Sequence, residues 1–181
     1  VIDNNSIDGS DKMMERNYSQ VEYLQLKKNY GFSRGYNNCF KYLKDKKPEF
    51  VLLLNNDTEV ESNILSSFID AAEKYGKDNI FGGKIFYKEY SNKIWYAGGI
   101  ANIKSGLLYH IGLRKLDSMK YSILKQTDYV TGCCLFTSWQ VINQLKGFDE
   151  NFDMYGEDVA FCFRFSQKGG KIFFIPSSIL W

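Results

Sequence analysis

Phe50-Val51-Leu52-Leu53-Leu54 is an apolar run that passes directly into the polar stretch Asn55-Asn56-Asp57. Five apolar residues are too few for a membrane helix, whereas a run of this length is typical of a buried parallel strand. Open α/β sheets bind ligands at the carboxyl ends of such strands. The sequence therefore predicts that Asp57 lies at a ligand-binding edge of a sheet.

A second acidic pair, Glu157-Asp158, follows Tyr155-Gly156 and opens a stretch with the spacing of an amphipathic helix. Acidic residues are ordinary in the first turn of a helix, so capping alone is one explanation of the pair. The other explanation is catalytic, because a carboxylate within about 3 Å of a hydroxyl group can remove its proton. The motif by itself leaves both explanations open.

Helices and strands alternate through the first half of the chain. Leu65, Phe68, Ile69 and Ala72 have helical spacing and predict a helix that begins near Ser62 and ends at Gly76. Alternation at this spacing indicates βαβ units, and hence an α/β fold with a mostly parallel central sheet and helices on both faces. Further strands are expected at 1–2 and 21–26, and further helices at 10–17 and after a glycine-containing loop at 29–37.

The second half has a less regular pattern. Strands are predicted at 80–87, 95–100, 129–136 and 171–176, with a helix that ends at Gly147 and an irregular stretch at 102–119. The 181 residues suffice for one domain with a sizeable core, and two domains would each be thin. We expect a single domain with two halves, 1–79 and 80–181.

The charge of the chain argues against a dedicated nucleic-acid-binding protein. The formal net charge is +2, from 23 basic and 21 acidic residues. Lysines gather at positions 41, 44, 46 and 47; a solvated helix face is the simpler interpretation, and contact with anionic lipid or a phosphate-bearing acceptor is the alternative. No apolar run reaches ~18 residues. We therefore expect a cytoplasmic protein, with peripheral association at the inner face of the cell membrane as the alternative.

The cysteine and histidine content argues against structural zinc. Cys39, Cys133, Cys134 and Cys162 show no CxxC spacing, and one histidine, His110, accompanies them. We expect Cys39 and Cys162, on predicted apolar helix faces, to be reduced core residues, and His110 to have a surface or packing role. The many aromatic residues are expected mainly in the core, although rings near Trp95, Tyr96 or Trp139 are suited to stack on a sugar.

The order of these motifs resembles the family 2 glycosyltransferases, inverting nucleotide-sugar enzymes of the GT-A fold, and especially their rhamnosyltransferase-like branch. The resemblance rests on 1–10, 29–37, the Asn55-Asn56-Asp57 motif, and the blocks at 147–150 and 155–164. Each motif is weak alone, but their order is specific. Because the chain opens on the family's second strand, we expect it to lack the first strand and helix of the fold.

The resemblance implies that 1–79 is the nucleotide-binding half and that 80–181 is the acceptor-binding half. It also implies roles for residues on the nucleotide side. Asp3 and Asn4 would contact the nucleobase and ribose, and Asn37 would line the same pocket. Asp57 would ligate a divalent cation, Mg²⁺ or Mn²⁺, on the diphosphate, with Asn55 and Asn56 in the same motif. Asparagine stands at positions 4 and 56, where the family often has an acid.

The resemblance also implies roles on the acceptor side. Asp158 would be the catalytic base, and Glu157 is the neighbouring carboxylate that would replace it. Gly132 would serve either strand packing or space for the donor sugar. For Arg164, an ion pair and a phosphate contact are equally expected.

The implied function is a divalent-metal-dependent hexosyltransferase. It would move a sugar from a UDP-, dTDP- or GDP-sugar to a glycan or lipid-linked acceptor during cell-surface polysaccharide synthesis, with inversion. A non-catalytic nucleotide- or glycan-binding domain of the same fold is the alternative. A phosphotransfer or nucleotidyltransferase domain with a similar acid at a strand end is a more distant one.

Overall fold

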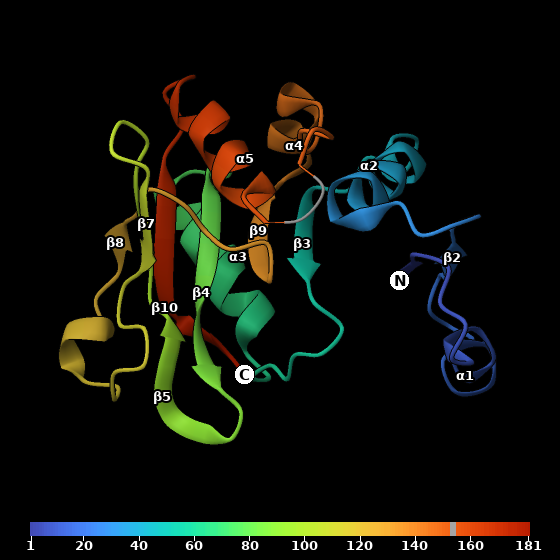
Figure 1. Cartoon of the computed structure of the whole chain (residues 1–181), viewed down its shortest axis with the longest axis horizontal. Helices are drawn as coiled ribbons and strands as arrows, with labels where there is room; N and C mark the ends of the chain where they lie inside the picture. The colour runs from blue at the N-terminus through green and yellow to red at the C-terminus, as the bar shows by residue number, and fades with distance from the viewer. Residues whose placement is uncertain (153–154) are drawn as a thin grey trace.

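A mixed sheet of six strands forms the centre of the computed structural model, which describes residues 1–152 and 155–181 (Figure 1). Its strands lie in the order β3-β9-β4-β10-β8, and β5 pairs with β4 off this path. Their bounds are β3 (Phe50–Leu54), β4 (Ile80–Tyr87), β5 (Tyr90–Tyr96), β8 (Lys125–Gln126), β9 (Cys134–Ser138) and β10 (Ile172–Leu180).

The strand directions differ from the mostly parallel sheet expected from the sequence. Within the described part of this sheet, β4 and β10 run parallel and the other pairings are antiparallel, including β3 with β9. Leu54, at the end of β3, lies opposite Cys134, at the start of β9. A short apolar run shows that a strand is buried but not which way its neighbour runs, because β9 comes from far along the chain.

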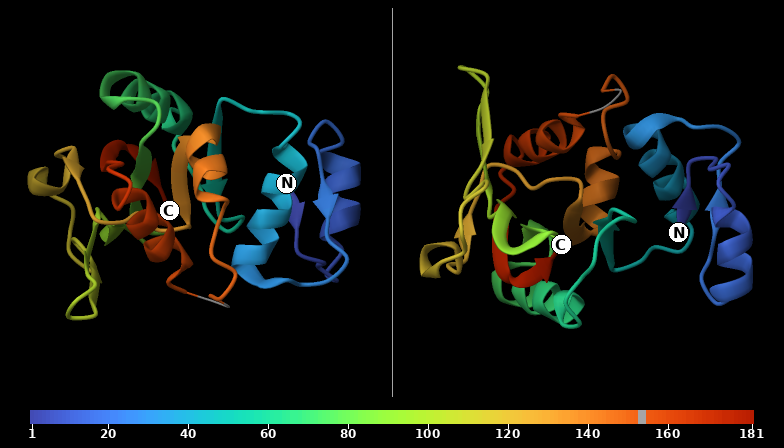
Figure 2. Two further views of the ribbon diagram at one scale, coloured as in Figure 1. Left: turned by 90° about the horizontal axis from the view of Figure 1, so that it is seen from above. Right: turned by 60° about the horizontal axis from the view of Figure 1, so that its bottom comes forward.

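Helices cover both faces of the sheet, as expected. Figure 2 shows α3 (Ile64–Tyr75) on one face, and α4 (Trp139–Leu145) and α5 (Glu157–Ser166) on the other. Residue Gly76 ends α3 with a φ of 106°, a backbone conformation that favours glycine. No helix in the described ranges has the length and apolar character needed to cross a membrane.

The buried face of α3 is shifted by one residue from the expected one. Ile64, Phe68 and Ala71 are buried with Ala72, whereas Leu65 and Ile69 remain 53% and 39% exposed. Both stripes have helical spacing, so periodicity alone does not separate them. The observed stripe places Phe68 against Phe136 of β9, with ring centroids 5.1 Å apart.

The N-terminal part forms a separate small unit. Strands β1 (Ile2–Asp3) and β2 (Leu24–Gln25) pair in parallel, and α1 (Ser10–Asn17) buries none of its residues. The following helix, α2 (Gly31–Leu43), lies between this unit and the six-stranded sheet (Figure 1). The strand predicted at 21–26 is shorter in the structure, where it is β2 (Leu24–Gln25).

The stretch expected to be irregular contains a hairpin and a short helix. Strands β6 (Gly99–Asn102) and β7 (Leu107–His110) pair antiparallel, and η1 (Met119–Tyr121) is a single 3-10 turn. The strand predicted at 95–100 divides because Gly98 has a φ of 107°. Lys84, buried in β4, holds the segment through Asp117, with Nζ to Oδ1 and Oδ2 distances of 3.0 Å.

All four cysteines are free thiols, in agreement with the reduced state expected of Cys39 and Cys162 from the sequence. Cys134 and Cys162 are buried, and Cys39 and Cys133 are partly buried. Burial raises the pKa of Cys133 to about 11 and the pKa values of Cys134 and Cys162 to about 12. The thiol form therefore predominates at neutral pH.

Candidate active site

Asp158 is held in one orientation at the start of α5. Its Oδ2 accepts a hydrogen bond from the backbone N–H of Gly132 at 2.9 Å, and its Oδ1 accepts one from Val159 at 2.8 Å. Gly156, at the N-cap, has a φ of 93° that lets the chain turn sharply into the helix. The Asp158 side chain stays partly exposed, so the carboxylate is both fixed and accessible.

Gly132 lies in a tight turn just before β9, in which Cys134 N donates to Thr131 O. A Cβ atom at position 132 would lie 2.7 Å from Cζ of Phe32, which is closer than carbon atoms pack. The Phe32 ring is itself held by Tyr36 and Phe148, at centroid distances of 4.7 and 5.7 Å. Gly132 therefore serves packing against α2 and supplies the N–H that orients Asp158.

The Asn55-Asn56-Asp57 motif lies on the other side of the same turn before β9 and is hydrogen-bonded to it. Asn55 N donates to Cys133 O at 3.1 Å, and Thr58 Oγ donates to Asn55 O at 2.7 Å. Asn56 and Asp57 are exposed beyond these bonds. Both acidic motifs thus flank the 131–133 turn, one bonded to Gly132 and the other to Cys133.

Asp3 and Asn4 belong to the β1–β2 unit and hold its loops. Asp3 accepts hydrogen bonds from Ser6, Tyr23 and Gln25. Burial acts to raise the pKa of Asp3, but these bonds outweigh it and the pKa is lowered. Asn4 binds Tyr30 N and Gly31 O at the start of α2. The first turn of α2 therefore links this polar loop, through Phe32, to Gly132.

Asn37 and Arg164 come together at the end of α4. The Asn37 amide bonds both N and O of Phe148, at 2.9 and 3.0 Å, and also Glu150. Arg164 donates to the carbonyl oxygens of Leu145 and Gly147, at 2.8 and 2.6 Å. A guanidinium at these positions satisfies carbonyl groups that a helix end leaves free. Both side chains thus have structural partners, which the sequence did not indicate.

Glu157 differs from its neighbour by being buried. It is 6% exposed, and within the described ranges its Oε2 has no hydrogen-bond partner. Burial raises the pKa of Glu157, and the charge of Asp158 adds to the effect. The two adjacent carboxylates therefore have different environments, with Asp158 the more accessible.

Comparison with known proteins identifies the family. The family model described as Glycosyl transferase family 2 matches residues 1–144. The chain belongs to this family. Its fold agrees, because a crystal structure of GalNAc-T7 with UDP, GalNAc and Mn²⁺ superposes with a TM-score of 0.72 at 16% identity, over 96% of this chain and 34% of that one. A197 from STIV gives a TM-score of 0.54 at 15% identity, over 88% of this chain and 71% of that one.

Three relatives resemble the chain in sequence. The low-salt glycan biosynthesis hexosyltransferase Agl10 of Haloferax volcanii is 28% identical over 95% of this chain and 54% of its own length. The rhamnosyltransferase WbbL of Escherichia coli is 24% identical, with 92% and 65% covered. An N-acetylglucosaminyl-diphospho-decaprenol L-rhamnosyltransferase of Mycobacterium tuberculosis is 20% identical, with 98% and 64% covered. The chain thus spans between about half and two thirds of these proteins.

From the sequence motif we expected a divalent cation near Asp57. The described residues contain no group of three or more histidine, cysteine or acidic side chains positioned to hold a metal ion. Asp57 offers one exposed carboxylate, and Asn55 and Asn56 offer amide oxygens, which hard cations accept. This donor set fits Mg²⁺ or Mn²⁺ when diphosphate and water supply the remaining oxygen ligands.

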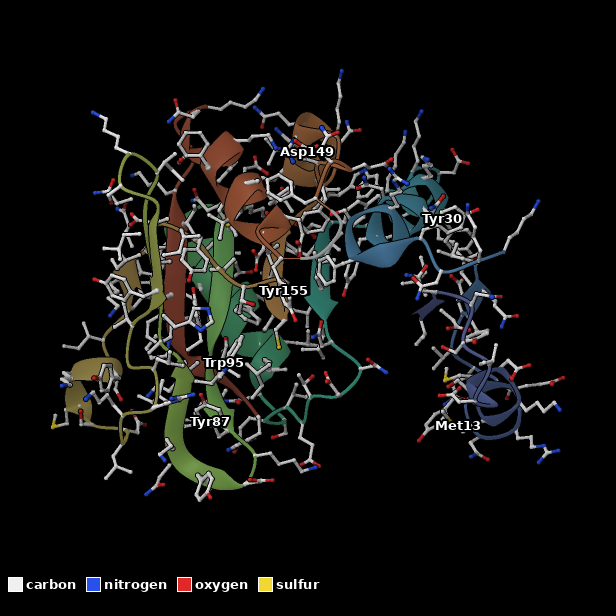
Figure 3. All side chains as sticks on the ribbon, in the orientation of Figure 1. Met13, Tyr30, Tyr87, Trp95, Asp149 and Tyr155 are labelled. Carbon is white, nitrogen blue, oxygen red and sulfur yellow. The ribbon has the colours of Figure 1, made fainter. Side chains whose placement is uncertain are left out.

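His110 lies near Asp158, although we expected a surface or packing role for it from the sequence. Its ring lies 4.5 Å from Trp95, 5.1 Å from Tyr96 and 5.9 Å from Tyr129, measured between centroids. Burial lowers the pKa of His110, while the charge of Asp158 acts in the opposite direction. Figure 3 labels Trp95, in β5, and Tyr155, which precedes α5. The adjacent aromatic residues Trp95 and Tyr96 were the available sequence signal.

A groove of about 540 Å³ lies away from these carboxylates. It is at the opposite end of β3, beside Pro48 and Trp139. The buried hydroxyl group in its lining, that of Ser138, already donates a hydrogen bond to Asp78. The accessible carboxylate of Asp158, beside the 131–133 turn, is the better candidate for acid–base chemistry.

Proposed function

We propose that the chain is the catalytic domain of an inverting glycosyltransferase. It transfers a sugar from a UDP-, dTDP- or GDP-sugar to a glycan or lipid-linked acceptor in cell-surface polysaccharide synthesis. The observation that carries the proposal is the Asp158 carboxylate, fixed by Gly132 and Val159 beside the turn that also binds the Asn55-Asn56-Asp57 motif. The relatives named as hexosyl- and rhamnosyltransferases support this reaction class.

Asp158 acts as the general base in this proposal. An acceptor hydroxyl oxygen attacks the anomeric carbon, the bond from that carbon to the diphosphate breaks, and the hydroxyl proton passes to Asp158. Each Asp158 oxygen accepts one backbone bond and keeps a further lone pair for the proton. One displacement inverts the anomeric configuration. A positioned base of this kind contributes typically ~10²–10⁴-fold.

Asp158 is a better candidate for the base than Glu157. The acceptor hydroxyl must come within about 3 Å of the base, and Glu157 is 6% exposed whereas Asp158 is partly open. The two backbone bonds to Asp158 also hold its carboxylate in one orientation. Glu157 is the buried neighbour whose environment favours the neutral form.

In this proposal the donor diphosphate binds beside Asp57. A divalent cation bound there would stabilise the negative charge that develops on the leaving diphosphate. Asp57 would hold the cation, with Asn55 and Asn56 beside it and the polar loops at Asp3 and Asn4 on the nucleoside side. The four free thiols suit the reducing cytoplasm, where we place the domain, with its acceptor at the membrane.

A non-catalytic nucleotide-binding domain of the same fold is the second candidate. The observation in its favour is the single exposed carboxylate at Asp57, with no cluster of three metal-ligating side chains in the described ranges. Such a domain would bind nucleotide without transferring sugar. Both candidates therefore predict nucleotide binding, and they differ in whether sugar is transferred.

The test is nucleotide release. The chain with Mn²⁺ is incubated with UDP-, dTDP- and GDP-sugars, with and without a polyprenyl-diphosphate glycan acceptor, and free nucleoside diphosphate is measured. We expect acceptor-stimulated release that Asp158→Asn abolishes and Asp70→Asn leaves intact, because Asp70 is an exposed residue of α3. Nucleotide binding without release from any donor would favour the non-catalytic candidate.

A further inference from the structure

Exposed apolar side chains are concentrated in one segment, residues 103–123. It runs from the tip of the β6–β7 hairpin to just beyond η1. The most exposed are Met119 at 88%, and Leu116 and Ile123 at 63% each. We call this set the edge surface; its apolar members are Ile103, Leu107, Leu108, Tyr109, Leu113, Leu116, Met119 and Ile123. Contiguous exposed apolar residues mark interaction sites more often than isolated ones.

The same segment is strongly basic. It contains Lys104, Arg114, Lys115 and Lys120, against one acidic residue, Asp117. Asp117 is neutralised by the buried Lys84. Within the part of the chain that the structure describes, the four basic side chains form no ion pair with an acid. Within residues 103–123 the edge surface therefore combines apolar and cationic groups with one acid that is already paired. Outside this segment, the exposed Asp128 lies beside the hairpin, where it accepts a hydrogen bond from Ala101 N.

The edge surface is firmly attached to the core. Arg114 N donates to Ile94 O, and Ile94 N donates to Lys115 O, both at 2.8 Å. Tyr121 of η1 is 7% exposed, and Ser122 binds Lys84. In Figure 1 the segment follows one side of the molecule, from the hairpin tip to η1, on the side away from the β1–β2 unit. The apolar residues are thus presented by an ordered edge.

We propose that the edge surface docks on the surface of an anionic lipid bilayer. Apolar side chains insert into the boundary between headgroups and acyl chains, and lysine and arginine bind anionic headgroups. Charge decides between this occupant and a second copy of the chain, because two identical edges would bring like charges together. The lysines at 41–47 are less suited, since Lys46 already pairs with Glu22.

Docking in this way brings the membrane next to the acceptor side of the site. Tyr109, within the edge surface, precedes His110, whose ring contacts Trp95 and Tyr129. A lipid-linked acceptor would therefore approach Asp158 from the bilayer side. This consequence rests on the proposed function, whereas the docking itself does not.

The test is binding to lipid vesicles by flotation. One set of vesicles contains equal parts of phosphatidylcholine and phosphatidylglycerol, and the other contains phosphatidylcholine alone. We expect binding to the anionic vesicles that high salt weakens. The variant Leu116→Ser/Met119→Ser/Ile123→Ser should lose binding to the anionic vesicles. The variant Lys104→Glu/Lys120→Glu should bind them more weakly by about 25-fold or more, because each cationic charge contributes about fivefold to the affinity. The matched control, Ile7→Ser/Leu65→Ser/Ile69→Ser, removes exposed apolar residues elsewhere and should bind as the unmodified chain does.

Equal binding by the Leu116→Ser/Met119→Ser/Ile123→Ser variant, or no binding by the unmodified chain, would overturn the proposal. Self-association in sedimentation equilibrium that the same variant removes would assign the surface to a second copy instead. Circular dichroism checks folding, and nucleotide release with a water-soluble acceptor separates this proposal from the previous one. If a variant loses vesicle binding but still releases nucleotide, the result concerns the edge surface alone. If the unmodified chain binds vesicles but releases no nucleotide, the result contradicts the proposed transferase.

Discussion

Asp158 and Asp57 lie on two sides of one turn but are held to very different degrees. The Asp158 carboxylate accepts two backbone hydrogen bonds, from residues in the turn and in α5. Asp57 is exposed, and within the described ranges its carboxylate accepts no hydrogen bond. The difference teaches that the protein itself organises Asp158, whereas Asp57 is left free; in the proposed transferase, the donor side would therefore rely on its ligand for organisation.

Physical chemistry gives a reason for this contrast. A base must lie within hydrogen-bonding distance of its proton at the transition state, so an error of about 1 Å is costly. A hard cation brings its own strong ligand geometry and draws an exposed carboxylate toward it. Rigid placement is therefore useful at Asp158, and freedom is tolerable at Asp57.

Asp158→Asn should have the largest effect. The amide cannot accept the acceptor proton, so we expect kcat to fall by ~10²–10⁴-fold while nucleotide affinity changes little. Stopped assays of nucleotide release give kcat, and calorimetry gives affinity. A comparable fall in both quantities would mean that Asp158 organises the donor as well, and the contrast between the two sides would fail.

Asp57→Ala should come next. Without the carboxylate the cation loses its protein ligand, so we expect the Mn²⁺-dependent part of nucleotide affinity to fall by ~10-fold or more, which is ~1.4 kcal/mol. Calorimetry with and without Mn²⁺ measures this part directly. Two further variants are useful controls. Asp57→Asn keeps the shape of the side chain, and Asp70→Ala removes an exposed charge at another position. Unchanged Mn²⁺ dependence would place the metal elsewhere.

Gly132→Ala sharpens the comparison from the rigid side. The new Cβ would press on Phe32 at 2.7 Å, so we expect a loss of ~1–3 kcal/mol in the free energy of unfolding and a lower kcat as Asp158 shifts. Denaturant melts and kinetics measure the two effects. Phe32→Leu combined with Gly132→Ala should recover part of both. No recovery in the double variant would show that contact with Phe32 is not what requires glycine.

Glu157→Gln should have the smallest effect, visible in the pH dependence of stability. The pKa of Glu157 is raised in the folded chain, so the unmodified protein loses stability as the pH rises from about 4.5, the ordinary value, through the raised pKa. Gln carries no such charge. The Tm of the variant, relative to that of the unmodified protein, should therefore rise as the pH goes from acidic to neutral. A constant Tm difference across that range would mean that the carboxyl is not buried in solution.

Local signals in the sequence predicted part of this structure correctly. The end of α3 at Gly76 and the start of α5 at Glu157 both follow from glycine and helix-end chemistry. The turn from β3 into Asn55 followed from an apolar run meeting polar residues. These features depend on neighbouring residues, which is why one sequence sufficed to locate them.

Features that depend on distant contacts were not predictable in this way. The antiparallel pairing of β3 with β9 joins segments far apart in the chain, and periodicity does not encode their relative direction. Asn37 binds Phe148, and Arg164 binds carbonyl groups of α4, through contacts that no local motif indicates. His110 lies near the site because β7 folds back beside β5. Its isolation in the sequence suggested the opposite.

The four protonated cysteines make the molecule convenient for labelling studies. Thiol-directed reagents attack the thiolate, and burial leaves little of it at Cys133, Cys134 and Cys162 near neutral pH. A cysteine introduced at an exposed position, for example in place of Ser105 at the hairpin tip, should react far faster than the native ones. Fluorophores or spin labels can then report on the hairpin without first removing any natural residue.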